Sequence, residues 1–287
     1  MIDTKYWNLS DELWLIENYP TKGLTACCDK IKNKTKEQII TKCRKLKLKL
    51  TKELRSEAIA FSHIKREKNH KFHVDPSQFI TIKTPEIAYI LGLLWADGTI
   101  RQHKYENTIA LECQLEDIKI FLPIFLSTGK WKCYYRNRIN RKPQGCIRTN
   151  NKPLVNFLKD NDYNAKSIES AYKILSKIPV NLKHYWFRGF LDGDGCITKD
   201  GRIEFSSSIN QKWDFITLLF DSMNIKYKTR ILTRIVKGKT HSASSIRLSK
   251  KNSIPFSKYI YQNYEYDNIG LQRKYNRYKE YIIKTNS

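Results

Sequence analysis

Apolar positions recur with a helical period in three short segments of the first 50 residues, and turn-forming residues separate these segments. Ser10 is the expected cap of the first helix and Pro20 its expected end, while Thr35 and Gln38 have the spacing of a capping box for the third. The pattern predicts helices over residues 10–19, 24–31 and 35–46. Their expected common core consists of Trp7, Leu13, Trp14, Ile16, Cys27, Ile31, Ile39, Cys43 and Leu46.

From Thr84 onward the pattern repeats once. Each half begins with an apolar helix, continues with a strand, an amphipathic helix and alternating strands, and closes with another helix. The opening helices end in Asp-Gly at Gly98 and Gly195, which lie 97 positions apart. The sequence therefore predicts an α+β fold with four parts: residues 1–50 as a three-helix module, 51–83 as a basic linker with one short helix, 84–180 as a first half and 181–287 as a second half.

Small residues lie four positions apart on each opening helix. Gly92 and Ala96 share one face of the first helix, and Gly189 and Gly193 share one face of the second. Side chains this small allow two helix backbones to approach closely. We therefore expect the two opening helices to pack against each other at a pseudo-twofold axis.

An aspartate ends each of these helices. The negative end of a helix dipole disfavours the carboxylates of Asp97 and Asp194, and the two would also repel each other. A divalent cation removes both problems, because Mg²⁺ prefers carboxylate, carbonyl and water oxygens. Asp-Gly is also a common turn dipeptide, but two copies at matched places favour a cation site. Gly98 and Gly195 are expected to leave the helices with positive φ.

The chain carries 53 Lys and Arg residues against 28 Asp and Glu residues, a net charge of +25. Such an excess is best explained by a polyanionic partner, and it points to nucleic acid. Cations at every second position predict one basic face on a strand in each half. These residues are Lys130, Lys132, Tyr134, Arg136 and Arg138 in the first half and Lys226, Lys228 and Arg230 in the second.

The seven cysteines include no Cys-x-x-Cys pair, which indicates free thiols in a reducing, intracellular compartment such as bacterial cytoplasm or an organelle. The longest apolar stretch, residues 87–96, is half the roughly 20 residues that a membrane span requires. No membrane partner is therefore expected.

The two opening helices resemble the paired motifs of a single-chain LAGLIDADG homing endonuclease. The first motif is ILGLLWADG at residues 90–98 and the second is FRGFLDGDG at residues 187–195. The resemblance covers residues 84 to about 283. It implies two αββαββα halves whose motif helices form the interface and whose sheets form a saddle over the DNA major groove.

The resemblance also implies roles for residues near the motifs. Asp97 and Asp194 would bind two or more Mg²⁺ or Mn²⁺ ions, with the backbone carbonyls of Ala96 and Gly193 nearby. Trp95 stands where the family usually has an acid, which Asp192 keeps, so Trp95 is expected to affect packing. The family also places a Gln and a Lys near the attacking water. The candidates for these are Gln114, Lys152 and Lys251, with Lys250 as an adjacent option.

The N-terminal segment resembles Myb/SANT-like helix-turn-helix modules, in which the third helix enters the major groove. The basic residues expected to contact DNA are Lys36, Lys42, Arg44 and Lys45. A small basic helical domain that reads no groove is the alternative interpretation.

The sequence thus predicts a monomeric, site-specific, metal-dependent DNA endonuclease that makes a staggered double-strand cut at a long asymmetric target. The alternative is an RNA maturase that binds intron RNA, or a non-catalytic DNA-binding regulator on the same scaffold. Both alternatives need the basic surface, but neither needs both motif aspartates.

Overall fold

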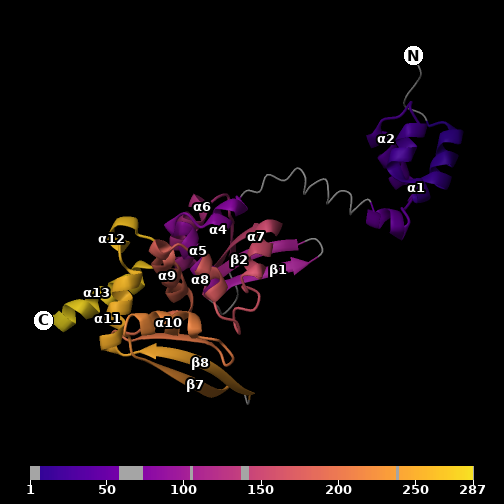
Figure 1. The fold of residues 1–287 in the computed structure, drawn as a ribbon. Helices are drawn as coiled ribbons and strands as arrows, with labels where there is room; N and C mark the ends of the chain where they lie inside the picture. Colours follow the sequence, from indigo (N-terminus) through magenta and orange to yellow (C-terminus); the bar gives the residue numbers. More distant parts are fainter. Residues whose placement is uncertain (1–6, 58–73, 104–105, 137–141, 237–238, 287) are drawn as a thin grey trace. The chain divides into compact units, whose positions relative to one another are not determined.

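The computed structural model describes residues 7–57, 74–103, 106–136, 142–236 and 239–286. The chain divides into two compact units, Met1–Lys71 and Phe72–Ser287 (Figure 1). None of the described helices is both long enough and apolar enough to cross a membrane.

The N-terminal unit contains α1 (Leu9–Lys30) and α2 (Lys36–Lys45). Gly23, with φ 75° and ψ −176°, interrupts α1, so residues 9–45 form three helical segments, and a further helical stretch follows at residues 52–57. The first segment continues past Pro20 to this glycine, and its cap is Asn8 in place of Ser10, because the Asn8 side chain accepts from the Ser10 amide. The predicted capping box of α2 is confirmed by reciprocal hydrogen bonds between Thr35 and Gln38.

Among the described residues of this unit, five form its buried hydrophobic core: Leu15, Cys27, Ile31, Ile39 and Cys43. Leu13 and Ile16 were expected in this core, but that expectation is wrong, because the two side chains are 52% and 45% exposed. Leu15, which lies between these two positions in α1, is fully buried.

The larger unit contains two halves, each with the order αββαββα. The first half consists of α5 (Pro85–Asp97), β1 (Gly98–His103), β2 (Glu106–Gln114), α6 (Leu115–Ser127), β3 (Lys132–Arg136), β4 (Gln144–Asn150) and α7 (Lys152–Asp160). The second half consists of α9 (Lys183–Asp194), β5 (Gly195–Ile197), β6 (Ile203–Ser208), α10 (Asp214–Ser222), β7 (Tyr227–Val236), β8 (Lys239–Leu248) and α11 (Lys250–Ile260). The predicted α+β fold and its internal duplication are therefore confirmed.

Additional elements flank these halves. They are α4 (Pro76–Thr81) before the first half, α8 (Tyr172–Lys177) and the 3₁₀ helix η1 (Val180–Leu182) between the halves, and α12 (Tyr264–Asp267) and α13 (Gln272–Asn286) at the end. Phe79 and Ile82 are fully buried, and Val74 pairs with Gly129. Residues 74–82, which the sequence analysis assigned to the linker, thus pack into the core of the larger unit.

Each half has one four-stranded antiparallel sheet, in the order β1-β2-β4-β3 and β5-β6-β8-β7. Alternate residues of each strand point to opposite faces of a sheet. In the first sheet Ile109, Leu111 and Ile147 turn toward the helices and are buried, while the neighbouring positions form an open face. The second sheet repeats the pattern with Phe205 and Ile246 on its buried face.

Candidate metal centre and nucleic-acid interface

The helices α5 and α9 lie side by side between the two sheets (Figure 1). A Cβ at Gly92 would overlap the carbonyl oxygen of Trp186, and one at Gly189 would overlap that of Tyr89. A Cβ at Gly193 would overlap the Cβ of Ala96. The four small residues singled out in the sequence therefore meet at this interface, where they permit direct contact between the two backbones.

This packing brings the two helix ends together. Asp97 is the last residue of α5 and Asp194 is the last residue of α9. The Oδ2 of Asp97 lies 3.3 Å from the position that a Cβ on Gly193 would occupy. Burial and then the nearby charge of Asp97 raise the pKa of Asp194 to about 6. Desolvation also raises the pKa of Asp97. The ends of the two helices thus bring Asp97 and Asp194 close enough for their charges to influence each other.

Gly98 and Gly195, which follow the two acids, were predicted to have positive φ, but the structure gives another reason for glycine at these positions. Gly98 has φ −66° and Gly195 has φ −89°, so the expectation of positive φ is wrong. A Cβ at Gly98 would overlap the carbonyl oxygen of Leu94, and one at Gly195 would lie 2.7 Å from that of Leu191. Each glycine therefore lets the chain pass directly from helix to strand against the last helical turn.

Two lysines that the sequence analysis missed lie at the same helix ends. The Nζ of Lys166 donates to the carbonyl oxygens of Leu94, at 3.2 Å, and of Ala96. Burial lowers the pKa of Lys166 to about 8, while the charges of Asp194 and Asp97 act in the opposite direction. This lysine offsets both the acids and the negative end of α5.

Lys274 is the counterpart at the end of α9. Its Nζ donates to the carbonyl oxygens of Leu191 at 2.6 Å, Asp192 at 2.9 Å and Gly195 at 2.7 Å. The positive charges of Lys166 and Lys274 both oppose the rise in the pKa of Asp97 and Asp194. Each half therefore contributes one buried or half-buried ammonium group to the centre.

Lys152 and Lys251 were the lysines predicted for this role. The structure places them in the first turns of α7 and α11, where both are exposed. The adjacent option Lys250 lies 3.9 Å from the carboxylate of Asp200. The cations beside Asp97 and Asp194 are those of Lys166 and Lys274.

The oxygen donors at the helix ends suit a hard cation. The two carboxylates retain access to solvent, and the carbonyl of Gly193 belongs to the same turn. The Ala96 carbonyl oxygen already accepts a hydrogen bond from Lys166, whereas no hydrogen bond from Lys274 reaches the Gly193 carbonyl among the described residues. Among the described residues no group of three or more His, Cys, Asp or Glu side chains is arranged to hold a metal ion. The residues fit a cation that takes its remaining ligands from water or phosphate, as Mg²⁺ commonly does.

Trp95 and Asp192 occupy matching positions in the two motifs but have different surroundings. Trp95 is buried, and its ring packs against those of Tyr163 and Trp186. Asp192 is also buried, and its Oδ2 accepts from the hydroxyl of Tyr89 and the amide of Leu271, both at 2.8 Å. Both positions therefore contribute to packing.

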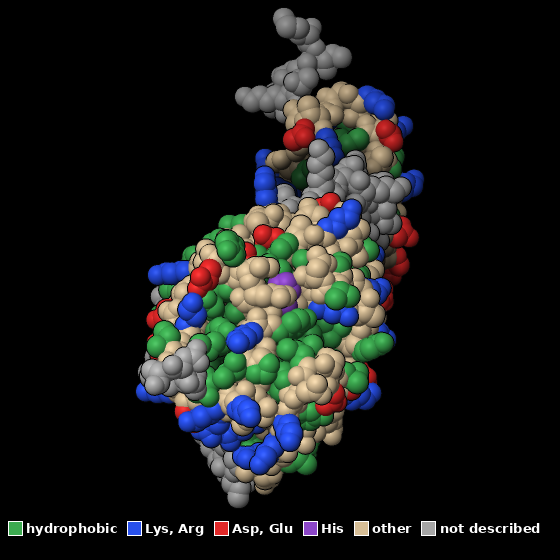
Figure 2. All heavy atoms as spheres, turned by 60° about the vertical axis from the view of Figure 1, so that its left-hand side comes forward, with side chains coloured by type: hydrophobic (Ala, Val, Ile, Leu, Met, Phe, Trp, Pro, Cys, Tyr) green, Lys and Arg blue, Asp and Glu red, His purple; other side chains and the backbone are tan. Residues whose placement is uncertain are grey.

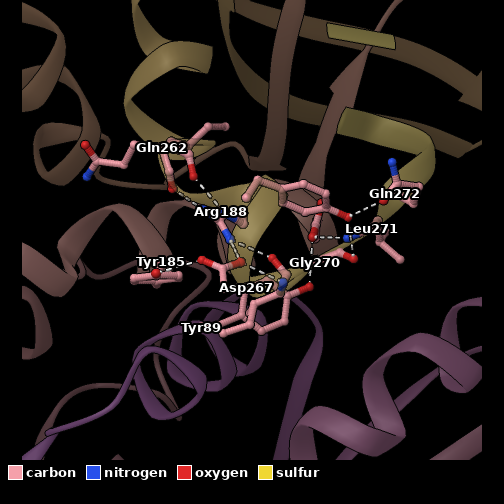
Figure 3. A network of polar contacts seen from close by, with 12 residues as sticks. Tyr89, Tyr185, Arg188, Gln262, Asp267, Gly270, Leu271 and Gln272 are labelled. Atoms are coloured by element: carbon pink, nitrogen blue, oxygen red, sulfur yellow. Dashed lines mark hydrogen bonds and ion pairs between the residues drawn. The ribbon is translucent and has the colours of Figure 1, made fainter. Parts of the chain in front are cut away.

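A polar network beside Asp192 fastens the C-terminal segment to α9 (Figure 3). Arg188 is fully buried and donates to the carboxylate of Asp267 at 3.0 Å and to the carbonyl oxygens of Ile260, Gln262 and Ile269. The segment held in this way leads directly into α13, which carries Lys274.

The predicted basic stripes lie on the open faces of both sheets. In the first half Lys132, Tyr134 and Arg136 are exposed and share the face opposite the helices, and Lys130 precedes the strand. Arg138 lies outside the described residues. Arg136 lies 3.4 Å from Glu112 on β2, across the intervening strand β4. Gln114, the last residue of β2, is exposed and faces Gln144 in the register of the same sheet.

In the second half Lys226, Lys228 and Arg230 are exposed at the start of β7. Two further cations belong to the open faces, because Arg148 is opposite Lys132 and Arg247 is opposite Lys228. Figure 2 shows Lys and Arg side chains gathered at the lower end of the larger unit, at the level of β7 and β8 in Figure 1. Arg148 and Arg247 were not predicted from the sequence, because only the pairing of the strands shows that they share a face with the predicted cations.

The four candidate DNA contacts in the N-terminal unit divide into two groups. Lys36, Arg44 and Lys45 are exposed on α2. Lys42 is half-buried and forms an ion pair with Glu12, and its ammonium lies 5.5 Å from the ring centroid of Trp7. Lys42 therefore holds α2 against α1, while the other three remain open to a partner.

No protein-family model matches this chain, and no curated protein is similar to it. Mesophilic variants of the homing endonuclease I-DmoI are 14% identical over 66% of this chain and 98% of theirs, with a TM-score of 0.48. I-DmoI in complex with DNA and Ca is 14% identical over 61% and 88%, with a TM-score of 0.43. Full-length DUF199/WhiA from Thermatoga maritima is 14% identical over 73% and 65%, with a TM-score of 0.39. Since all three TM-scores lie below 0.5, conclusions about this chain rest on its own residues.

Proposed function

We propose that this chain is a site-specific, divalent-metal-dependent DNA endonuclease of the homing type. The observation that carries the proposal is the meeting of Asp97 and Asp194 at the paired ends of α5 and α9, with the ammonium groups of Lys166 and Lys274 beside them. A structural role does not account for this arrangement, because burial raises the pKa of both carboxylates and so disfavours their charged forms.

In this proposal Asp97 and Asp194 hold the cations and a scissile phosphate lies above them. When bound, divalent cations would supply positive charge to the phosphate oxygens and lower the pKa of an attacking water. Lys166 and Lys274 add fixed positive charge next to the site where negative charge grows during cleavage. Gln114, exposed at the end of β2, would orient a water molecule in the first half. The second half has Ser208 at the end of β6 instead.

The open faces of the two sheets would bind the DNA duplex on either side of the metal centre. Their Lys and Arg residues suit the phosphate backbone, and the arginines can also contact guanine edges. The two faces differ in sequence, which favours an asymmetric target. Because one chain supplies both acids, a monomer would suffice to make a staggered cut in both strands, and the N-terminal module would lengthen the bound site.

The test compares Asp97→Asn, Asp194→Asn and a control, Asp160→Asn, which alters an exposed acid at the end of α7. We expect both site variants to bind target DNA as tightly as the unaltered protein and to lose double-strand cleavage in Mg²⁺. The control should cut normally. Full cleavage by both site variants would refute the proposal. Tight binding of intron RNA without any DNA cleavage by the unaltered protein would favour a maturase.

A further inference from the structure

A cavity of about 370 Å³ lies at one end of the second sheet, beside the start of α11. Five cationic side chains line it: Arg202, Lys226, Lys228, Arg230 and Arg247. Two of them have acidic partners, since Arg202 lies 2.9 Å from Asp200 and Arg247 lies 3.8 Å from Glu204. Within the described part of the chain, no ion pair involves Lys226, Lys228 or Arg230. The cavity therefore has an excess of positive charge.

The strand register sets two of these cations opposite each other, while Glu204 on β6 is opposite Arg247 on its other side. Lys228 on β7 is directly opposite Arg247 on β8, and both point to the open face of the sheet. Like charges directly opposite each other destabilise an antiparallel pair. In the first half the matching pair is Lys132 and Arg148, where the guanidinium of Arg148 lies 5.6 Å from the ring centroid of Tyr134. In the second half an anion between the two cations would relieve the repulsion.

The start of α11 adds hydrogen-bond donors to the same cavity. The first amides of a helix have no partner within the helix. At the matching helix α7 the side chain of Asn151 caps the Leu154 amide at 3.0 Å. At α11 the side chain of the cap residue Ser249 makes no such hydrogen bond to a backbone amide, and its Oγ accepts from the side chain of Asn252 at 3.0 Å. Ser249 and Asn252 both line the cavity.

We propose that this cavity binds one phosphate group of the nucleic-acid backbone. The proposal rests on the proposed function, which supplies the nucleic acid. Lys228 and Arg247 flank the phosphate, Arg230 and Lys226 add charge, and the uncapped end of α11 donates backbone hydrogen bonds, as helix N-termini commonly do to phosphates. The second half thus holds the DNA backbone at a built site at the end of its sheet.

Asn252→Asp tests the proposal without removing a packed side chain. The substitution is isosteric and places a carboxylate in the first turn of α11, which favours the helix but repels a phosphate. The matched control is Asn276→Asp on α13, an exposed position whose side-chain oxygen accepts from Gln272 in either form. A second variant, Lys228→Gln with Arg230→Gln, removes two exposed cations from the cavity.

DNA affinity is measured for each full-length protein at several salt concentrations. We expect Asn252→Asp and the double variant to bind target DNA about tenfold more weakly, with a salt slope shallower by about one, and Asn276→Asp to match the unaltered protein. If all variants bind DNA with the same affinity and the same steep salt dependence as the unaltered protein, the proposed phosphate site is wrong and the proposed function still stands. Absence of DNA binding by the unaltered protein would instead refute the proposed function.

A thermal-shift arm with inorganic phosphate distinguishes the source of the anion. Stabilisation by phosphate that Asn252→Asp abolishes, combined with equal DNA affinity in every variant, would identify a site for free phosphate and overturn the assignment to the DNA backbone. Weaker DNA binding by Asn252→Asp than by Asn276→Asp supports the assignment.

Discussion

The ammonium of Lys274 donates to the carbonyl oxygen of Leu191 over 2.6 Å, at the last turn of α9. The first half has the same contact between Lys166 and Leu94, and Leu94 lies 97 positions before Leu191. The two lysines themselves are 108 positions apart, so they reach equivalent carbonyls from places that the sequence repeat does not align. The two halves therefore share the lysine–carbonyl contact at the helix end, although the lysines do not occupy matching positions in the sequence repeat.

This arrangement predicts that both lysines are needed for cleavage. Replacing either Lys166 or Lys274 by Met removes a positive charge beside the acids while keeping most of the side-chain volume, and we expect single-turnover cleavage about 100-fold slower. DNA affinity should change less than threefold. Lys152→Met, which alters an exposed lysine at the start of α7, is the control. Equal cleavage rates in all three variants would exclude a role for the central lysines.

The raised pKa of Asp194 predicts how stability depends on pH without metal. Its value of about 6 exceeds the ordinary 3.8, so the folded state binds the proton more tightly than the unfolded state. The stability that this group contributes is present below pH 3.8 and is lost as the pH rises through 6. Asp194→Asn should therefore stabilise the metal-free protein by about 1–2 kcal/mol at pH 8, after allowance for solvent exposure, and by much less at pH 4.

Thermal unfolding in a chelator and in Mg²⁺ measures this effect. Mg²⁺ should raise the melting temperature of the unaltered protein at pH 8 and leave that of Asp194→Asn nearly unchanged. Asp160→Asn serves as the control for the loss of one carboxylate. If Asp194→Asn is less stable than the unaltered protein in the chelator at pH 8, the charge of Asp194 does not destabilise the metal-free fold.

The sequence allowed the central helices, their contact and both acids to be predicted, because short-range patterns encode them. Small residues four apart mark the α5–α9 interface, and a carboxylate at a helix end is unfavourable wherever the helix lies. Lys166 and Lys274 could not be found in this way, since their contacts join segments about 70 to 80 residues apart and depend on where the chain returns after the closing helices. The exposure of Leu13 and Ile16 could not be predicted from their apolar side chains alone, because it depends on which face of the helix turns toward the core.

Helix contact at Gly193 predicts a stability change that a second substitution reverses. Gly193→Ala would bring the new Cβ into overlap with the Cβ of Ala96, and we expect a loss of about 1–3 kcal/mol in the free energy of unfolding. Exchanging the two residues, Ala96→Gly with Gly193→Ala, should recover at least half of that loss. Urea denaturation of the three proteins measures both effects. A double variant no more stable than Gly193→Ala would show that the destabilisation arises elsewhere.

The exposed basic residues on α2 lead to a prediction about the length of DNA that the chain protects. Lys36, Arg44 and Lys45 are exposed, so replacing all three by Ala should shorten the protected DNA at one end and lower affinity about tenfold, while leaving the cut position unchanged. Lys32→Ala is the control, since it removes an exposed lysine outside α2 whose ammonium lies 3.6 Å from Asp29. Nuclease footprinting with parallel cleavage mapping distinguishes the two variants. A footprint of unchanged length in the triple variant would show that α2 does not contact DNA, because its remaining exposed surface carries no comparable cluster of cations among the described residues.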